Sequence, residues 1–139
     1  LQDRVVICSS STSMTPTPLC GDSTTGWHEG WIIFHDKNNT ATYDGAMDIK
    51  SLTGVAITGV TITPVDLGSN PTNIVNYISF GPPAGEALLI DAANQSGIFI
   101  ICTDADLTTQ RGVIVNYSGR ISSTQEPTII NSACVSSSP

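Results

Sequence analysis

The sequence predicts a mostly β fold in which two antiparallel sheets pack together. Short apolar segments recur along the chain of 139 residues, and Gly, Pro, Asn and Asp residues separate them at short intervals. Apolar residues at helical spacings of three and four never persist beyond a turn or two, so no long helix is expected. A chain of this length can bury a core of its own, and we expect residues 1–139 to form a single domain.

The first half of the chain contains the clearest strand. Residues 5–9 are expected to form a short strand, and the Ser/Thr/Pro-rich residues 10–25 a loop. Aromatic and β-branched side chains in residues 27–35 favour a pleated surface. We therefore expect a central strand that is covered on both sides. The period of two residues places its apolar side chains on both faces, with Trp27, Trp31 and Ile33 on one and Ile32 and Phe34 on the other.

The remaining strands follow from shorter apolar runs. Residues 36–44 are expected to form a polar hairpin turn, and residues 64–73 a second loop. Gly59 is expected to mark a β-bulge, because the alternation of apolar side chains changes face there. The strands are expected at residues 46–52, 55–63, 74–80, 87–90, 97–102, 112–117 and 120–122.

The charge of the chain argues against nucleic acid as a partner. Lys and Arg number 5 against 12 Asp and Glu, which gives a net charge of -7, and charged residues make up only 12% of the chain. Such a surface repels a phosphate backbone unless its basic groups gather on one face. The five basic residues are scattered in sequence, at Arg4, Lys37, Lys50, Arg111 and Arg120. The low charge and the abundance of Ser and Thr suit an extracytoplasmic β protein.

The four cysteines are expected to form two disulfide bonds. No Cys-x-x-Cys pair is present and the chain has only 2 His, so the usual spacing of metal ligands is missing. Three connectivities are possible, and we favour Cys8 with Cys20 and Cys102 with Cys134. Each of these bonds joins a predicted strand to a segment that lacks apolar anchors. Two disulfides imply an oxidising compartment.

No catalytic site and no cofactor are expected. The chain has no Gly-x-Ser-x-Gly motif, and the odd separation of His28 and His35 points their rings to opposite faces of a regular strand. Asp104 and Asp106 fit a solvated turn better than a pair of catalytic carboxylates. We therefore expect a protein that is not an enzyme and that has no catalytic residues and no metal site.

One segment carries oxygen side chains at the spacing of a calcium loop, at Asp36, Asn38, Thr40 and Asp44. Ala41, however, stands where such a loop requires Gly, and Met47 stands where it requires a bidentate Glu. An Asx-rich hairpin turn is therefore the preferred interpretation. Sequons for N-glycosylation begin at Asn38, Asn94 and Asn116 and carry meaning only in a eukaryotic secreted protein.

Three motifs in a fixed order resemble a known family. They are Gly-Trp-x-x-Gly-Trp-x-x-Phe-x-Asp at residues 26–36, Ile78-Ser79-Phe80 before a Gly-rich turn, and Ser-Gly-Arg at residues 118–120. In this order they resemble the head domain of the GspH/FimT/FimU family of minor pilins and pseudopilins, over about residues 5–134. Among its members, the chain looks most like the FimU-like minor pilins of type IV pili.

The resemblance implies a truncated α+β pilin head without the N-terminal helix that anchors family members in the inner membrane and packs in the filament. It implies a structural minor pilin in the tip or priming complex that initiates type IV pilus assembly, and so supports twitching motility and adhesion. The expected partners are other minor pilins, the major pilin and, through the helix, the inner membrane. The expected location is the bacterial inner membrane and periplasm before assembly, and the extracellular pilus fibre after it. Apolar surface should be exposed where the helix would pack.

The same family offers two alternatives. FimT-like members resemble DNA-uptake proteins for natural transformation, in which a Gly-Arg-x-Arg motif contacts phosphates, but here Ser122 replaces the second arginine after Arg120. A basic patch that contained Arg111 and Arg120 would favour this alternative. The other is a GspH-like pseudopilin of type II secretion. The paired cysteines favour the FimU-like interpretation over both.

Overall fold

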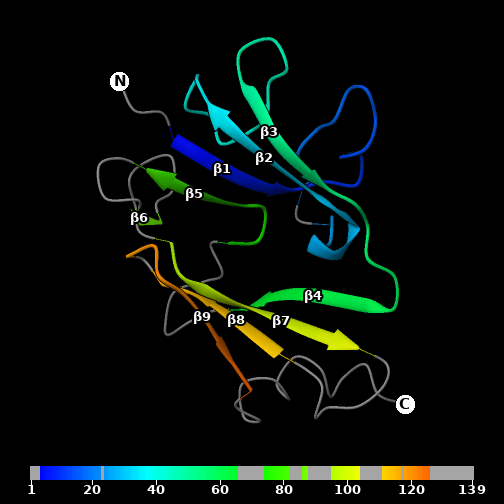
Figure 1. The fold of residues 1–139 in the computed structure, drawn as a ribbon, viewed down its shortest axis with the longest axis vertical. Coiled ribbons are helices and arrows are strands. Elements are labelled where there is room, and N and C mark those ends of the chain that lie inside the picture. The colour runs from blue at the N-terminus through cyan, green and yellow to red at the C-terminus, as the bar shows by residue number, and fades with distance from the viewer. Residues whose placement is uncertain are drawn as a thin grey trace.

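The computed structural model describes residues 4–22, 24–65, 74–81, 86–87, 95–103, 111–116 and 118–125. Within these residues the chain forms nine strands and one short 3-10 helix, η1 (Trp27–Glu29), and the strands lie in two antiparallel sheets (Figure 1). The predicted class, mostly β with two packed antiparallel sheets, is confirmed. None of the helical structure in the described ranges has the length and apolar character that crossing a bilayer requires.

The first sheet has five strands in the order β3-β2-β1-β5-β6. In its register, Ile7 of β1 lies opposite Ile33 of β2 on one side and opposite Ile78 of β5 on the other. Three isoleucines therefore form a row across one face of the sheet. The strands are β1 (Arg4–Ser9), β2 (Trp31–Asp36), β3 (Ile49–Gly54), β5 (Tyr77–Gly81) and β6 (Glu86–Ala87).

The second sheet has four strands in the order β4-β7-β8-β9. Ile101 of β7 lies opposite Ile62 of β4, and Phe99 lies opposite Val113 of β8. In Figure 1 this sheet lies below the first one, and the connection from β3 to β4 joins the two on the right. The strands are β4 (Val60–Val65), β7 (Gly97–Thr103), β8 (Arg111–Val115) and β9 (Ile121–Thr124).

Each sheet has an apolar core on the face that points away from the other sheet. In the first sheet this core consists of Val6, Cys8, Ile32 and Phe34, and the loop residues Cys20 and Tyr43 pack on it. In the second sheet it consists of Ile98, Ile100 and Cys102. A third cluster, in which Phe80 and Phe99 pack around Ile74, Ile78 and Val115, joins the two sheets.

The prediction of a continuous strand over residues 27–35 is wrong at its start. Trp27–Glu29 forms η1, and β2 begins only at Trp31. Gly26 N donates a hydrogen bond to the Glu29 carboxylate at 2.6 Å, which closes the turn. Gly30 then adopts a φ of 134°, and a side chain at this position would meet the carbonyl oxygens of the neighbouring segments.

The strand predicted over residues 55–63 forms only from residue 60 onward, and the bulge predicted at Gly59 is wrong. β4 begins at Val60, and Gly59, with a φ of 75°, lies in a turn outside any strand. Residues 55–59 instead connect the two sheets, and Ile57 N donates to His28 O at 2.9 Å in this connection. A register irregularity occurs elsewhere, between Ile33 and Phe34, where β2 pairs with β3.

Other strands overlap their predictions with shifted ends. β3 begins at Ile49 rather than at residue 46, because Asp44 O accepts hydrogen bonds from Met47 N and Asp48 N and keeps these residues in a turn. β5 begins at Tyr77 rather than at residue 74. Residues 88–90 of the strand predicted at 87–90 lie outside the described residues.

Candidate functional site

An apolar cavity of about 390 Å³ lies between the two sheets. Its walls are the faces that the two sheets turn toward each other, and all of its lining residues are apolar. We call this cavity the inter-sheet groove. It is lined by Ile7, Trp27, Trp31, Ile33, Ile62, Ile78, Phe99, Ile101 and Val113.

The alternation of strand side chains explains this lining. Ile7 lies between the fully buried Val6 and Cys8 in sequence, and Ile101 lies between the buried Ile100 and Cys102. Ile7, Ile33, Ile62 and Ile101 are themselves only half-buried. Burying a large apolar side chain completely contributes about 1.5–3 kcal/mol, so an apolar element that filled the groove would gain this stabilisation from several side chains at once.

Trp27 closes one wall of the groove and ties the two sheets together. Its indole Nε1–H donates to the Val75 carbonyl oxygen at 2.9 Å, just before β5 of the first sheet. Its ring packs edge-on against Phe99 of the second sheet, with centroids 5.0 Å apart. Trp27 is buried, so this contact fixes how far apart the sheets stand.

His28 holds the edge strand β4 beside η1. Its backbone oxygen accepts from Ile57 N at 2.9 Å, and its Nδ1 accepts from Ile62 N at 3.3 Å. The second bond requires the tautomer in which Nδ1 carries no proton. Since Ile62 lines the groove, His28 positions one of its walls.

Trp31 is positioned by a glycine on the neighbouring strand. Gly54 of β3 lies opposite Trp31 in the sheet, and a Cβ atom at residue 54 would overlap the Trp31 ring. The indole therefore lies directly over the Gly54 backbone. Any larger residue at position 54 would displace Trp31 and change this end of the groove.

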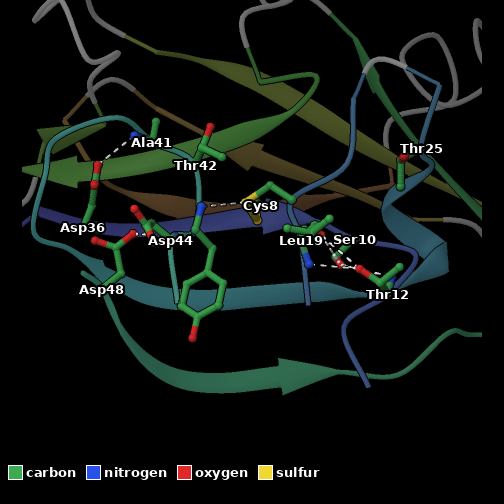
Figure 2. Close-up of a disulfide and its surroundings, with 12 residues drawn as sticks. Cys8, Ser10, Thr12, Leu19, Thr25, Asp36, Ala41, Thr42, Asp44 and Asp48 are labelled. Atoms are coloured by element: carbon green, nitrogen blue, oxygen red, sulfur yellow. Dashed lines mark hydrogen bonds between the residues drawn. A yellow bond between two sulfur atoms is a disulfide. The ribbon is translucent and has the colours of Figure 1, made fainter. Parts of the chain in front are cut away.

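Cys8 and Cys20 form a disulfide bond on the outer face of the first sheet, as expected from the sequence (Figure 2). The bond ties residues 10–20, which we call the disulfide loop, to β1. Tyr43 N donates to Cys20 Sγ at 3.3 Å, and Gly21 N donates to Ser9 O at 2.7 Å. The disulfide therefore also anchors the neighbouring loop that contains Tyr43.

Cys102 is buried in β7, and no cysteine in the described part of the chain is free. Its predicted partner, Cys134, lies outside the described residues, so the pairing of these two cysteines stays a prediction.

Residues 36–48, which we call the Asx loop, are organised by two buried carboxylates. Asp36 accepts from Thr40 N at 3.1 Å and from Ala41 N at 2.8 Å. Asp48 accepts from Lys37 N at 2.7 Å and from Asp44 N at 2.9 Å, and Figure 2 shows these carboxylates in the loop. Both carboxylates thus bind backbone N–H groups across the loop, whereas the Asx turn within it is formed by Asp44, whose Oδ1 accepts from Ala46 N at 2.9 Å. Within the described ranges, no three His, Cys, Asp or Glu residues gather as a metal site.

The two arginines suspected of contacting DNA lie at opposite ends of β8. Arg111 begins the strand, whereas Arg120 follows it in the turn before β9, where its backbone oxygen accepts from Asn116 N at 2.9 Å. At about 3.3 Å per residue, the two positions are roughly 16 Å apart along the strand. Arg111 faces Gln125, whose amide oxygen, when turned toward the guanidinium, accepts at 2.6 and 2.9 Å. Arg120 is exposed, and its side chain makes no ion pair within the described residues.

The other candidate residues lie apart from the groove. His35 lies in β2, and Asn38 of the first sequon lies in the Asx loop, where its Oδ1 accepts from Thr40 Oγ1 at 3.0 Å. Asp104, Asp106 and Asn94 lie outside the described residues, as does the middle residue of the sequon at Asn116.

The second wall of the groove and the role of Gln95 were not predicted from the sequence. The unbroken apolar run of residues 98–102 was a usable signal, because such a run is typical of a strand with an apolar neighbour on both faces. Gln95 is fully buried; its Oε1 accepts from Ser79 N and its Nε2 donates to Tyr77 O, both at 2.9 Å. Gln95 thereby extends the hydrogen bonding of β5, and no local sequence pattern predicts this role.

The fold and the groove define a class of protein: a two-sheet β domain with an apolar groove between the inner faces of its sheets. Comparison with known protein families matches residues 2–119 to the family described as type II transport protein GspH. The chain therefore belongs to the GspH family, whose members are pilin-like minor pilins and pseudopilins. Comparisons with curated proteins and with solved structures gave no match.

The GspH family is a family of structural, pilin-like proteins, and its members are associated with the periplasm and with pilus-type filaments. The suspected family of the sequence analysis is thereby confirmed at the level of GspH.

Proposed function

We propose that this domain is the head of a minor pilin of a type IV pilus, in the tip or priming complex that starts filament assembly. Its partners are then other minor pilins and the major pilin, and it acts at the inner membrane before assembly and in the extracellular fibre after it. Twitching motility and adhesion follow from this role. The observation that carries the proposal is the inter-sheet groove, taken together with membership in the GspH family.

The proposed occupant of the groove is a hydrophobic helix that precedes Leu1 in the intact protein, as the family resemblance implies. Three features support this occupant. The groove has two apolar walls, most of its side chains are only half-buried, and no charged side chain lines it. A helix is about 10 Å in diameter and carries side chains all around its axis, so it can contact both walls at once. A helix held in this way links the head to the membrane and later to the filament.

The choice of a type IV pilus rests on the disulfide between Cys8 and Cys20, which fits a head exposed outside the cell. The second candidate is a GspH-like pseudopilin of type II secretion, which the description of the matched family favours. Both candidates use the groove in the same way and differ in the machine they serve.

A DNA-uptake role has less support. The chain carries a net charge of -7. Arg111 and Arg120 lie at opposite ends of β8, and the sequence has no other arginine between them. Two separated cations among many carboxylates attract a phosphate backbone weakly.

The experiment that separates the two machines is deletion of the gene in its source organism. Loss of surface pili and twitching with normal secretion of type II substrates is the result we expect. Normal piliation with a secretion defect would indicate instead that the protein is a pseudopilin of type II secretion.

A pair of variants then tests the groove itself. Ile62→Asp places a charge on the groove wall, whereas Thr61→Asp places the same charge on the exposed opposite face of the same strand. Complementation should fail with Ile62→Asp and succeed with Thr61→Asp. Equal rescue by both variants would contradict a role of the groove in assembly.

A further inference from the structure

A second cavity, of about 460 Å³, lies outside the inter-sheet groove, where the disulfide loop meets the Asx loop. We call it the Thr42 pocket. Figure 2 shows three of its residues, Leu19, Thr42 and Asp44, near the disulfide. Its walls combine the apolar Leu19 and Tyr43 with the polar Asn38, Thr40, Thr42 and Asp44.

Hydrogen bonds within the protein hold the walls of the pocket in place. Asp36 and Asp48 fix the Asx loop through backbone N–H groups, and the disulfide holds Tyr43 through its N–H to Cys20 Sγ. The Tyr43 ring also packs edge-on against Phe34, with centroids 5.4 Å apart. A ligand would therefore lose little affinity in ordering these walls.

Several polar atoms of the pocket remain available to a ligand. Asp44 uses Oδ1 to accept from Ala46 N at 2.9 Å, and its Oδ2 has no partner among the described residues. The Thr42 hydroxyl and Asn38 Nδ2 also have no partner among the described residues. Thr42 forms its hydrogen bonds through its backbone N and O, and Asn38 accepts through Oδ1. The pocket is thus lined by a carboxylate, a hydroxyl and an amide that can each bind a ligand.

The chemistry of these groups selects the class of ligand. No Lys, Arg or His lines the pocket, and the net charge of -7 repels anions. A single carboxylate is too few for a metal ion, which needs more hard oxygen ligands. A ligand with neighbouring hydroxyl groups, in contrast, needs hydrogen-bond donors and acceptors together in its binding site. The carbon skeleton of such a ligand packs on apolar surface, which Tyr43 and Leu19 supply here.

We propose that the Thr42 pocket binds a neutral saccharide. Asp44 Oδ2 accepts from sugar hydroxyls, the Thr42 hydroxyl and the Asn38 amide bond their neighbours, and Tyr43 and Leu19 cover a C–H face. This site is distinct from the groove, so it does not depend on the proposed role in assembly.

The test is an NMR titration of the isotope-labelled domain with glucose, galactose, mannose and N-acetylglucosamine, each up to about 50 mM, where a millimolar site is largely filled. We expect at least one sugar to give saturable shift changes confined to the disulfide and Asx loops. Asp44→Asn and Thr42→Val should each weaken this binding roughly tenfold, as for the loss of a hydrogen bond to a ligand.

Two matched variants serve as controls, Asp22→Asn in another exposed turn and Thr61→Val on β4, and neither should alter the binding. Unchanged signals outside the two loops show that each variant is folded. The proposal is overturned if none of the sugars gives localised, saturable changes, or if the pocket and control variants bind equally. It is also overturned if Ca²⁺ alone shifts these loops and no sugar does.

Discussion

Trp27 and Phe99 join the two sheets through an edge-on ring contact, with centroids 5.0 Å apart and an interplanar angle of 71°. Trp27 comes from the turn before β2, and Phe99 from the middle of β7, so the contact bridges sheets that share no backbone ladder. Both residues line the inter-sheet groove. The contact thus sets the spacing of the walls between which an apolar helix is proposed to lie.

Trp27→Phe keeps a ring against Phe99 but removes the N–H that bonds Val75 O. We expect it to lower the free energy of unfolding by about 2 kcal/mol, because a part-buried carbonyl loses this hydrogen bond and the smaller ring leaves a void. Urea denaturation measures the change. Trp31→Phe is the matched control, and since Trp31 is half-buried it should cost less than about 1 kcal/mol. Equal losses would mean that Trp27 does not tie the sheets.

Gln95→Leu tests the amide that completes β5. The substitution removes the two hydrogen bonds that the buried amide makes with Ser79 N and Tyr77 O, which should cost about 2–4 kcal/mol. Thermal unfolding followed by circular dichroism provides the measurement. Gln125→Leu, at an exposed position, should change stability by no more than about 0.5 kcal/mol. A Gln95 variant as stable as the Gln125 variant would refute this role.

The double variant Cys8→Ala/Cys20→Ala removes a crosslink between residues separated by 12 positions. On the loop-entropy model the loss should be about 3 kcal/mol. Guanidinium denaturation of the oxidised proteins gives the difference. A loss below about 0.5 kcal/mol would show that the disulfide loop is held by its other contacts, among them Ser13 Oγ–H to Gly54 O at 2.6 Å.

Asp36→Asn tests the carboxylate that builds the Asx loop. The Asn oxygen can accept only one of the two backbone N–H groups, and the Asn NH₂ group then faces the other N–H, which is also a donor. We therefore expect the free energy of unfolding to fall by about 2 kcal/mol. The exposed Asp22→Asn should leave the midpoint of denaturation unchanged. If both variants unfold at the same denaturant concentration as the parent, the two bonds of Asp36 contribute nothing to stability.

The strands that the sequence predicted well are those in which apolar residues alternate or run unbroken. β1, β2 and β7 contain such runs, and the disulfide of Cys8 followed from a strand next to a loop without anchors. The errors lie where tertiary contacts override the pattern. Trp27 has strand propensity, but the Glu29 bond to Gly26 N and the backbone of Gly30 turn it into η1.

The groove was foreseen only as exposed apolar surface, on the strength of the family resemblance. Its walls arise when Ile7, Ile33 and Ile78 of one sheet face Ile62 and Ile101 of the other, and this depends on the packing of the sheets. The pairing of Asp36 and Asp48 with backbone N–H groups, and the position of Gln95 beside β5, depend on contacts that no periodicity encodes.

The most direct measurement for the central claim is site-specific photo-crosslinking in the intact protein. A benzophenone amino acid at position 62 points into the groove, whereas at position 61 it points away from it. If the groove holds the helix, mass spectrometry should find crosslinks from position 62 to a hydrophobic segment before Leu1, and none from position 61. Crosslinks from both positions in equal yield, or from position 62 only to other proteins, would contradict the account.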